Sequence, residues 1–277
     1  MILRTALPWL VGALIVSSCA APGPGPPFDL TTAVVSDDTT GRTFVSAPDA
    51  GGPWPVVIML HGIGGDPHEL DRLAATVAEQ GNVVFNIAWD PAGDLTDIDC
   101  GYRYSESIAA RYGGDPEHVA AVGYSAGATV ALLGATFTEP HVPASDMQMC
   151  SLVDGRISPP AQPGVILPAV LVMIAPCMFE HEHQSFQTEP QGGNTDLQIT
   201  VISGEDDTVC EPWQQRDGVE LLRDAGYQTR LVSVPAADHL TLVYQDLVDG
   251  HQDIVPDSRA GQRVTQTIVD TIASAEW

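Results

Sequence analysis

Long apolar runs, separated by segments with helical periodicity, restrict the fold of this chain more than any other feature. In residues 54–62, 82–89 and 118–125 there is little of the polar alternation of a half-exposed strand, and each is expected to be a strand that is buried on both faces. Further strands are expected over residues 166–175, 197–204 and 229–235. Strands of this kind are typical of parallel sheets that helices cover on both sides.

The segments between the runs supply the covering helices. Residues 67–80 place Leu70, Leu73 and Val77 on one helical face, and Gly81 follows as a helix terminator. Further helices are expected over residues 103–112, 126–137, 211–225 and 257–275. The alternation predicts an α/β fold with a mainly parallel central sheet and helices on both faces.

Two other segments complete the expected architecture. Residues 31–48 alternate apolar and polar residues around a Thr-Thr-Gly turn, which predicts an antiparallel hairpin before the first buried strand. Residues 176–196 contain Pro, Gly, Asn and Gln and are interpreted as a loop. No segment between strands is long enough to predict a large lid domain.

The chain is strongly acidic and contains no lysine. Its 277 residues include 36 Asp and Glu against 11 bases, and the formal charge at pH 7 is −25. Such a surface repels phosphate backbones and anionic lipid headgroups, so nucleic-acid binding and an electrostatic membrane patch are not expected. Every base is Arg, which excludes a Schiff-base or PLP lysine and the P-loop lysine.

The N-terminus has the layout of an export signal. Arg4 precedes an apolar run from Ala6 to Val16, which is too short for a comfortable transmembrane helix. The residues up to Cys19 resemble a bacterial lipobox, in which the cysteine is lipidated and becomes the mature N-terminus. Cleavage after Ala20 is the alternative and gives a freely secreted protein. Both versions export the chain.

Three regions follow from this layout. Residues 1–19 are expected to be a signal peptide with a lipobox, and residues 20–28 a stiff Pro/Gly linker. Residues 29–277 are expected to form one folded domain. The only membrane contact expected is a lipid anchor at Cys19, because two or more acyl chains hold a protein stably at a bilayer.

The cysteine count agrees with an oxidising compartment. Besides Cys19, the chain has an even number of cysteines, which allow two disulfides in three connectivities: Cys100, Cys150, Cys177 and Cys210. Cys177 and Cys210 both lie just past predicted neighbouring strands, so we favour that bridge and hence Cys100–Cys150.

Residues 123–127 (GYSAG) fit the pattern G-x-S-x-G, with Ser125 at its centre. A chain this rich in glycine shows the pattern by chance about once in eight cases, so its context must decide. Ser125 lies where a buried strand meets a small-residue helix. A sharp strand-to-helix turn lifts a serine hydroxyl clear of the sheet, and Gly123 and Gly127 leave room for it. Ser125 is therefore a candidate nucleophile.

A serine hydroxyl needs a base to accept its proton and an acid to orient that base. Asp206 and Asp207 directly follow one predicted strand, and His239 follows the next. The order Ser, Asp, His is that of α/β-hydrolases, and all the positions fall at the carboxyl edge of the sheet. His251 is the rival base, but it lies in a polar run well beyond the last strand.

A glycine-rich segment supplies candidate donors for an oxyanion. Residues 61–65 (HGIGG) follow an early strand of the sheet, and their glycines allow a backbone N–H to turn toward Ser125. The N–H groups of Ile63 and Ala126 are the expected oxyanion hole, since Ala126 begins a helix whose N-terminus favours negative charge. His61 is expected to be a structural residue of this loop.

Residues 54–275 resemble the α/β-hydrolase superfamily, in particular its lid-poor esterase, dienelactone-hydrolase-like and cutinase-like polyesterase branches. Residues 111–127 (RYGGDPEHVAAVGYSAG) also resemble a segment common in carboxylesterases and hormone-sensitive-lipase relatives. The resemblance implies that Ser125 is the nucleophile, His239 the general base and then acid, and Asp207 the orienting acid. Asp207 fits the family pattern better than Asp206, because Gly204 and Thr208 flank it as Gly-x-x-Asp and a small turn residue.

The chain departs from these branches at several positions. Ile63 interrupts the glycines of the hormone-sensitive-lipase motif, and serine replaces the cysteine nucleophile of true dienelactone hydrolases. Tyr124 and Ala126 stand where cutinases commonly have His and Met. The departures leave the substrate open. Tyr124 and Trp89 are expected to contact it, with a core position as the alternative for Trp89.

No metal or organic cofactor is expected. His181 and His183 flank Glu182, but this spacing suits a strand and the sequence offers no third ligand, so a solvated loop is the interpretation. The expected function is a secreted or lipid-anchored serine esterase that acts on small-molecule or polymeric esters. An acyltransferase or serine peptidase with the same triad is one alternative, and a non-catalytic surface binding lipoprotein is the other.

Overall fold

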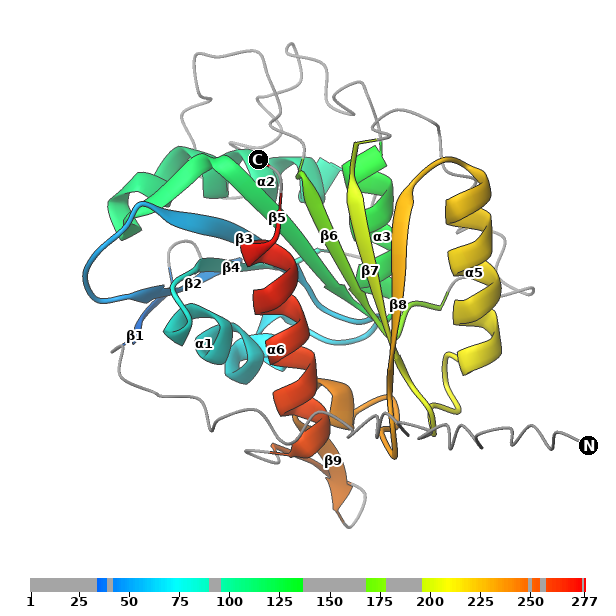
Figure 1. Ribbon diagram of the computed structural model, residues 1–277. Helices are drawn as coiled ribbons and strands as arrows, with labels where there is room; N and C mark the ends of the chain where they lie inside the picture. Colours follow the sequence, from blue (N-terminus) through cyan, green and yellow to red (C-terminus); the bar gives the residue numbers. More distant parts are fainter. Residues whose placement is uncertain are drawn as a thin grey trace, which may run out of the picture. The chain divides into compact units, whose positions relative to one another are not determined.

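An eight-stranded, mainly parallel sheet forms the centre of the protein in a computed structural model (Figure 1). The structure describes residues 34–38, 42–89, 96–136, 168–177, 196–248, 251–254, 258–275 and 277. The predicted signal peptide, the linker and most of the predicted loop 176–196 lie outside these residues. None of the described helices is long and apolar enough to cross a bilayer.

The strands lie in the order β1-β2-β4-β3-β5-β6-β7-β8. Their bounds are Val34–Asp38 (β1), Thr43–Pro48 (β2), Trp54–Leu60 (β3), Val83–Ile87 (β4), Gly114–Tyr124 (β5), Val170–Ile174 (β6), Gln198–Gly204 (β7) and Gln228–Val234 (β8). Only β2 runs against the others, since it pairs antiparallel with β1 and β4 while the remaining pairs are parallel. The predicted fold class and the opening hairpin are confirmed.

Five helices of the described residues cover the sheet, and two separate apolar clusters show which face each one covers. α1 (Asp71–Glu79) and α6 (Arg259–Ala273) pack on one face, and both lie in front of the sheet in Figure 1. The opposite face is covered by α2 (Thr96–Ala109), α3 (Ala126–Thr136) and α5 (Pro212–Asp224). Because both faces are buried, the central strands have no exposed side, which explains their unbroken apolar runs.

The helix α2 begins earlier than the sequence predicted, at Thr96 rather than near residue 103. The segment before residue 103 is rich in Asp, which suggested a loop. Ile98 and Tyr102 nevertheless lie one helical turn apart and are both buried against the sheet. The buried Asp99 carboxylate also pairs with the Arg103 guanidinium at 3.4 Å. This neutralisation lets an acidic turn join a buried helix.

A short hairpin after the last sheet strand was not predicted. Its strands β9 (Gln245–Val248) and β10 (His251–Ile254) pair antiparallel with each other, and Val248 lies opposite His251. The two residues between them are Asp249 and Gly250, a dipeptide typical of tight hairpins. His251, the rival triad base, is therefore the first residue of β10.

Three short 3₁₀ helices complete the described elements: η1 (Pro67–Leu70), η2 (Ala110–Tyr112) and η3 (Thr241–Val243). The first of them directly precedes α1, and the third follows the loop after β8. Parallel strands end at one edge of a sheet, so the segments after β3, β4, β5, β6, β7 and β8 all begin at the same edge. Every predicted site residue lies in or beside one of these segments, with Trp89 in the one after β4.

Candidate active site

Ser125 occupies a sharp turn between β5 and α3. Its φ angle is +54°, in the left-handed region that residues with side chains seldom adopt, and its N–H donates to the carbonyl of Ile174 at 2.8 Å. A β-carbon at Gly123 would overlap the backbone of Ala128, and one at Gly127 would overlap the carbonyls of Leu60 and His61. The two glycines are therefore required for this turn to close against the neighbouring loop.

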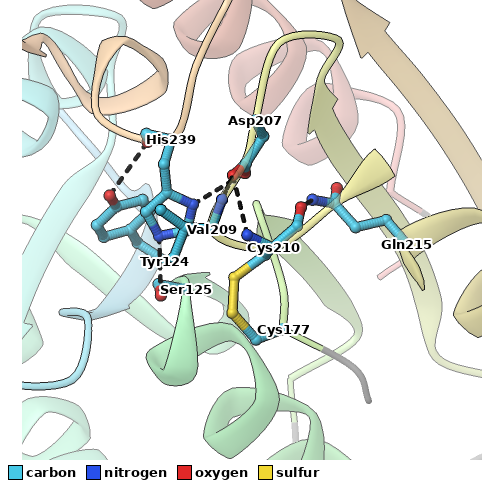
Figure 2. Close-up of a disulfide and its surroundings, with 8 residues drawn as sticks. All are labelled: Tyr124, Ser125, Cys177, Asp207, Val209, Cys210, Gln215 and His239. Atoms are coloured by element: carbon cyan, nitrogen blue, oxygen red, sulfur yellow. Dashed lines mark hydrogen bonds and ion pairs between the residues drawn. A yellow bond between two sulfur atoms is a disulfide. The ribbon is translucent and has the colours of Figure 1, made fainter. Parts of the chain in front are cut away.

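The imidazole of His239 lies between Ser125 and Asp207 (Figure 2). Its Nε2 is 3.0 Å from the Ser125 Oγ, and its Nδ1 is 2.8 Å from the Asp207 Oδ2. The carboxylate only accepts, so Nδ1 carries the proton and Nε2 is the acceptor for the serine hydroxyl. All three side chains are buried, with His239 the most exposed at 8%. The structure thus forms a hydrogen-bonded chain from the hydroxyl through the imidazole to the carboxylate.

The second oxygen of Asp207 fixes the acid in place. Oδ1 accepts the backbone N–H groups of Val209 and Cys210, each at 2.9 Å, so the carboxylate closes its own loop after β7. Asp206 is exposed and its N–H donates to the carbonyl of Ala237. Of the two candidate acids, Asp207 is the one that contacts His239.

A disulfide ties this acid loop to the neighbouring strand. Cys210 is bonded to Cys177, which follows β6, and the predicted bridge between these two cysteines is confirmed. The carbonyl of Cys210 also accepts from the Gln215 side chain at 2.5 Å, as Figure 2 shows. Cys100 is disulfide-bonded as well, while its predicted partner Cys150 lies outside the described residues.

The loop after β3 presents the N–H of Ile63 outward. Gly62 and Ile63 share one peptide unit, in which the C=O and N–H point in opposite directions. The Gly62 carbonyl is held from inside the turn by the Gly65 N–H at 3.2 Å and by the His61 Nδ1 at 2.8 Å. The Ile63 N–H therefore points out of the turn, and the Ile63 side chain is 63% exposed.

The predicted second oxyanion donor, Ala126, is the first residue of α3. The first N–H groups of a helix have no partner inside it, so they are free to face a negative charge. The tight packing of Gly127 against the His61 carbonyl brings the start of α3 directly against the loop after β3. The two predicted donors therefore belong to segments that touch each other.

Trp89 packs against this loop from the core side and hydrogen-bonds to His61. Its indole N–H donates to the His61 carbonyl at 3.0 Å, and its backbone N–H points to the His61 Nε2 at 3.4 Å. The side chain is buried in the core cluster, with its ring stacked on His61 at 5.5 Å. Burial lowers the pKa of His61, which keeps the imidazole neutral and its Nε2 able to accept. The structure thus places Trp89 in the core, the alternative position given for it above. Its contact with substrate stays a prediction.

Tyr124 holds the backbone of His239. Its hydroxyl donates to the His239 carbonyl at 3.1 Å, and the two rings lie 5.1 Å apart. Burial raises the pKa of Tyr124 well above its usual range, and the nearby acids Glu69, Asp207 and Asp238 add to this. The hydroxyl therefore stays protonated and donates. Its predicted contact with substrate also stays a prediction.

Sequence reasoning missed Glu69, a partly buried acid in η1. Its carboxylate accepts the Gly62 N–H at 2.9 Å. Asp66 and Glu69 have the D-x-x-E spacing of a capping box, which would have predicted a local bond instead. Burial raises the pKa of Glu69, and the Gly62 hydrogen bond opposes the rise.

The other candidate ligands give no metal site in the described part of the chain. His181, Glu182 and His183 lie outside the described residues. Within those residues, no group of three or more His, Cys, Asp or Glu side chains is arranged to hold a metal ion.

Comparisons with solved structures show the fold of α/β-hydrolases. A dienelactone hydrolase-like protein from Klebsiella pneumoniae aligns with a TM-score of 0.61 and 18% identity, over 87% of this chain and 99% of that one. Esterase 2 of Thermogutta terrifontis, phosphoramylated by tabun, gives 0.59 and 16% over 90% and 96% of the two chains. An inhibited esterase B from Lactobacillus rhamnosis gives 0.60 and 16% over 84% and 81%. No protein-family model and no curated protein matches the sequence.

Proposed function

We propose that the protein is a serine esterase that hydrolyses carboxylic esters through Ser125, His239 and Asp207. The observation that carries the proposal is the hydrogen-bonded chain from the Ser125 hydroxyl through His239 to Asp207, at 3.0 and 2.8 Å. Its position after β5, β7 and β8 is the one in which α/β-hydrolase folds build such a triad. The esterases among the structural neighbours support the same reaction class.

In the proposed mechanism the Ser125 Oγ attacks the ester carbonyl carbon while its proton passes to the His239 Nε2. The C=O π electrons move to the oxygen, and the resulting oxyanion accepts hydrogen bonds from the N–H groups of Ile63 and Ala126. His239 then donates its proton to the leaving alkoxide, so an alcohol departs and an acyl-serine remains. Water adds by the same route and releases the carboxylic acid.

Asp207 has a fixed role in this cycle. Its Oδ2 accepts the Nδ1–H of His239, which holds the imidazole in the tautomer that has a free Nε2. When Nε2 takes the serine proton, the same carboxylate stabilises the positive imidazolium. The two backbone N–H groups on Oδ1 hold the carboxylate in the orientation that turns Oδ2 toward His239.

The proposed substrates have an apolar acyl or alcohol group. Three large apolar side chains are exposed on the segments that carry the site: Ile63 at 63%, Val209 at 62% and Trp213 at 45%. Ile63 belongs to the loop with the proposed oxyanion donor, and Val209 follows Asp207 by two residues. Exposed apolar groups beside a polar centre favour esters whose non-reacting part is apolar, including polymeric esters.

We also propose that the protein is exported and anchored through a lipid on Cys19. The support is the lipobox-like residues up to Cys19 together with the Cys177–Cys210 disulfide, since such bonds persist in oxidising compartments. The measurement is palmitate incorporation by bacteria that express the full chain. Incorporation that is lost in Cys19→Ala supports the anchor, and its absence from the wild type favours free secretion.

The esterase proposal is tested by labelling and turnover together. Wild-type protein is expected to hydrolyse p-nitrophenyl esters across a chain-length series and to take up a fluorescent phosphonate at Ser125. Ser125→Ala should show neither. Ser107→Ala is a matched control, because Ser107 lies on α2 and its hydroxyl donates to the carbonyl of Tyr104.

The outcomes separate the rival functions. A wild-type protein with neither label nor turnover would contradict the esterase and favour a binding lipoprotein. Label without ester hydrolysis, combined with cleavage of a peptide amide or transfer to an added alcohol, would replace the esterase with a peptidase or an acyltransferase. A polyester film, assayed beside the soluble esters, shows whether the site with its exposed Ile63, Val209 and Trp213 side chains accepts a polymer.

A further inference from the structure

We propose that Glu69 is a positioning residue of the oxyanion loop, which we define as residues 61–65: its carboxylate holds the Gly62 N–H and thereby aims the N–H of Ile63. The inference rests on the proposed function, in which Ile63 is an oxyanion donor. Glu69 belongs to η1, the short helix that follows the loop, and its Oε2 is 2.9 Å from the Gly62 nitrogen. The carboxylate therefore reaches back seven residues along the chain.

The contact fixes one peptide plane of the loop and limits the next. The Gly62 N–H is held by Glu69 on one side, and the Gly62 carbonyl is held by Gly65 and His61 on the other. With both polar atoms of Gly62 bound, the peptide that carries the Ile63 N–H has no freedom to flip. A glycine-rich loop without such a contact samples many orientations, because glycine has the largest conformational freedom.

The Glu69 carboxylate and the Tyr124 ring both pack closely against Gly62. A β-carbon at Gly62 would lie 3.3 Å from the ring of Tyr124 and 3.4 Å from the Glu69 Oε2. The backbone of Glu69 is itself anchored, because its carbonyl accepts from the buried Gln245 side chain at 3.0 Å. Glu69 thus links the oxyanion loop to the first residue of β9, the strand that follows the connection with His239.

Helix capping does not account for the Glu69 side chain. The cap of η1 is supplied by Asp66, whose Oδ1 accepts the His68 N–H at 2.8 Å. In a capping box the glutamate would return to the backbone of the capping residue. Here the carboxylate reaches past Asp66 to Gly62, which assigns its hydrogen bond to the loop.

The test compares Glu69→Ala, Glu69→Gln and Glu117→Gln on the most active p-nitrophenyl ester. Glu69→Ala removes the acceptor and should lower kcat by about 10- to 100-fold with KM within about twofold, because a misaimed donor is lost only in the transition state. Glu69→Gln keeps an oxygen that accepts the Gly62 N–H and should stay within about threefold of wild type. Glu117→Gln is the matched control, because Glu117 is exposed near the start of β5, at the end of the strand that lies away from Ser125.

A boronic acid gives a second readout, because its tetrahedral adduct with serine mimics the oxyanion. Its affinity should fall in Glu69→Ala by the same factor as kcat, while the affinity for the product carboxylic acid stays unchanged. Unchanged kcat in Glu69→Ala overturns the inference. A Glu69→Gln variant as slow as Glu69→Ala also overturns it, since the charge and not the hydrogen bond would then be what matters.

Hydrogen–deuterium exchange decides the inference even if the wild type hydrolyses no ester. In that case the proposed function fails, yet a peptide covering residues 61–66 still reports on the loop. Exchange in this peptide should be faster in Glu69→Ala than in wild type and unchanged in Glu69→Gln. Equal exchange in all three proteins would show that Glu69 does not hold the loop, whatever the reaction.

Discussion

The backbone N–H of Cys210 donates to the Asp207 carboxylate at 2.9 Å, so the disulfide-bonded residue and the acid that orients His239 are fixed to each other. The bond to Cys177 carries this restraint to the end of β6. The position of the acid therefore depends on a covalent link that lies outside the triad itself.

Replacing both cysteines, in Cys177→Ser/Cys210→Ser, should lower stability and kcat/KM together. The bond closes a loop with a sequence separation of 33, and loops of this length are worth about 3 to 4 kcal/mol in the unfolded-chain entropy model. Urea unfolding measures the first effect and ester turnover the second. A variant with reduced stability but wild-type kcat/KM would show that the acid loop holds its shape without the bond.

Asp207→Asn should lower kcat by on the order of 10³- to 10⁴-fold with the fold retained. An amide in this position no longer stabilises the imidazolium and allows the wrong imidazole tautomer. Asp206→Asn is the matched control, because that side chain is exposed and adjacent in sequence. Steady-state kinetics on both variants check this. Equal losses in the two would mean that charge on the loop, and not contact with His239, is responsible.

Tyr124→Phe removes the hydroxyl that donates to the His239 carbonyl. The loss should cost about 1 kcal/mol of unfolding free energy, and kcat/KM should fall several-fold because the imidazole is less well held. Tyr102→Phe offers a contrast: that hydroxyl is buried and has no hydrogen-bond partner among the described residues. Its removal should leave stability unchanged or higher. Identical thermal melts for the two variants would contradict the role given to Tyr124.

The stability difference between wild type and Glu69→Gln should depend on pH. Burial raises the pKa of Glu69 above its ordinary value of 4.5, so the folded protein holds this proton more tightly than the unfolded chain. The stability that this tighter proton binding by Glu69 adds is fully present below the unfolded-state pKa. It is lost as the pH rises through the folded-state pKa. The difference, wild type minus variant, should therefore fall from about pH 4.5 upward and then level off.

Urea unfolding at a series of pH values measures this difference, and other titrating groups cancel because both proteins share them. A difference that rises with pH over the same interval would mean that the Gly62 hydrogen bond outweighs burial and lowers the pKa.

The central strands could be predicted well, because a strand buried on both faces has an unbroken run of apolar residues in the sequence. The residues of β3 are apolar from end to end and are buried at 0% exposure from Val56 to Leu60. The start of α2 was not predicted because the buried Asp99 pairs with Arg103, and this pairing exists only once the helix has formed. The β9–β10 hairpin was missed although Asp249-Gly250 is a recognisable turn signal.

The order of Ser125, Asp207 and His239 along the chain was enough to predict which side chains meet, because each follows a strand that ends at one edge. The contacts of Glu69, Tyr124 and Trp89 could not be predicted from the sequence. They depend on which loop lies over which, and side-chain direction within a loop has no periodicity to read. The same limit applied to Trp89, whose indole N–H finds the His61 carbonyl 28 residues away.

The wide spacing of the triad along the chain makes turnover a reporter of refolding. Ser125 and His239 are 114 residues apart and come together only when β5, β6, β7 and β8 have aligned side by side. A chain that has regained its helices but not this alignment is silent in an ester assay. Recovery of activity after dilution from denaturant therefore times the last long-range step, and the lag behind recovery of helical circular dichroism measures how late that step occurs.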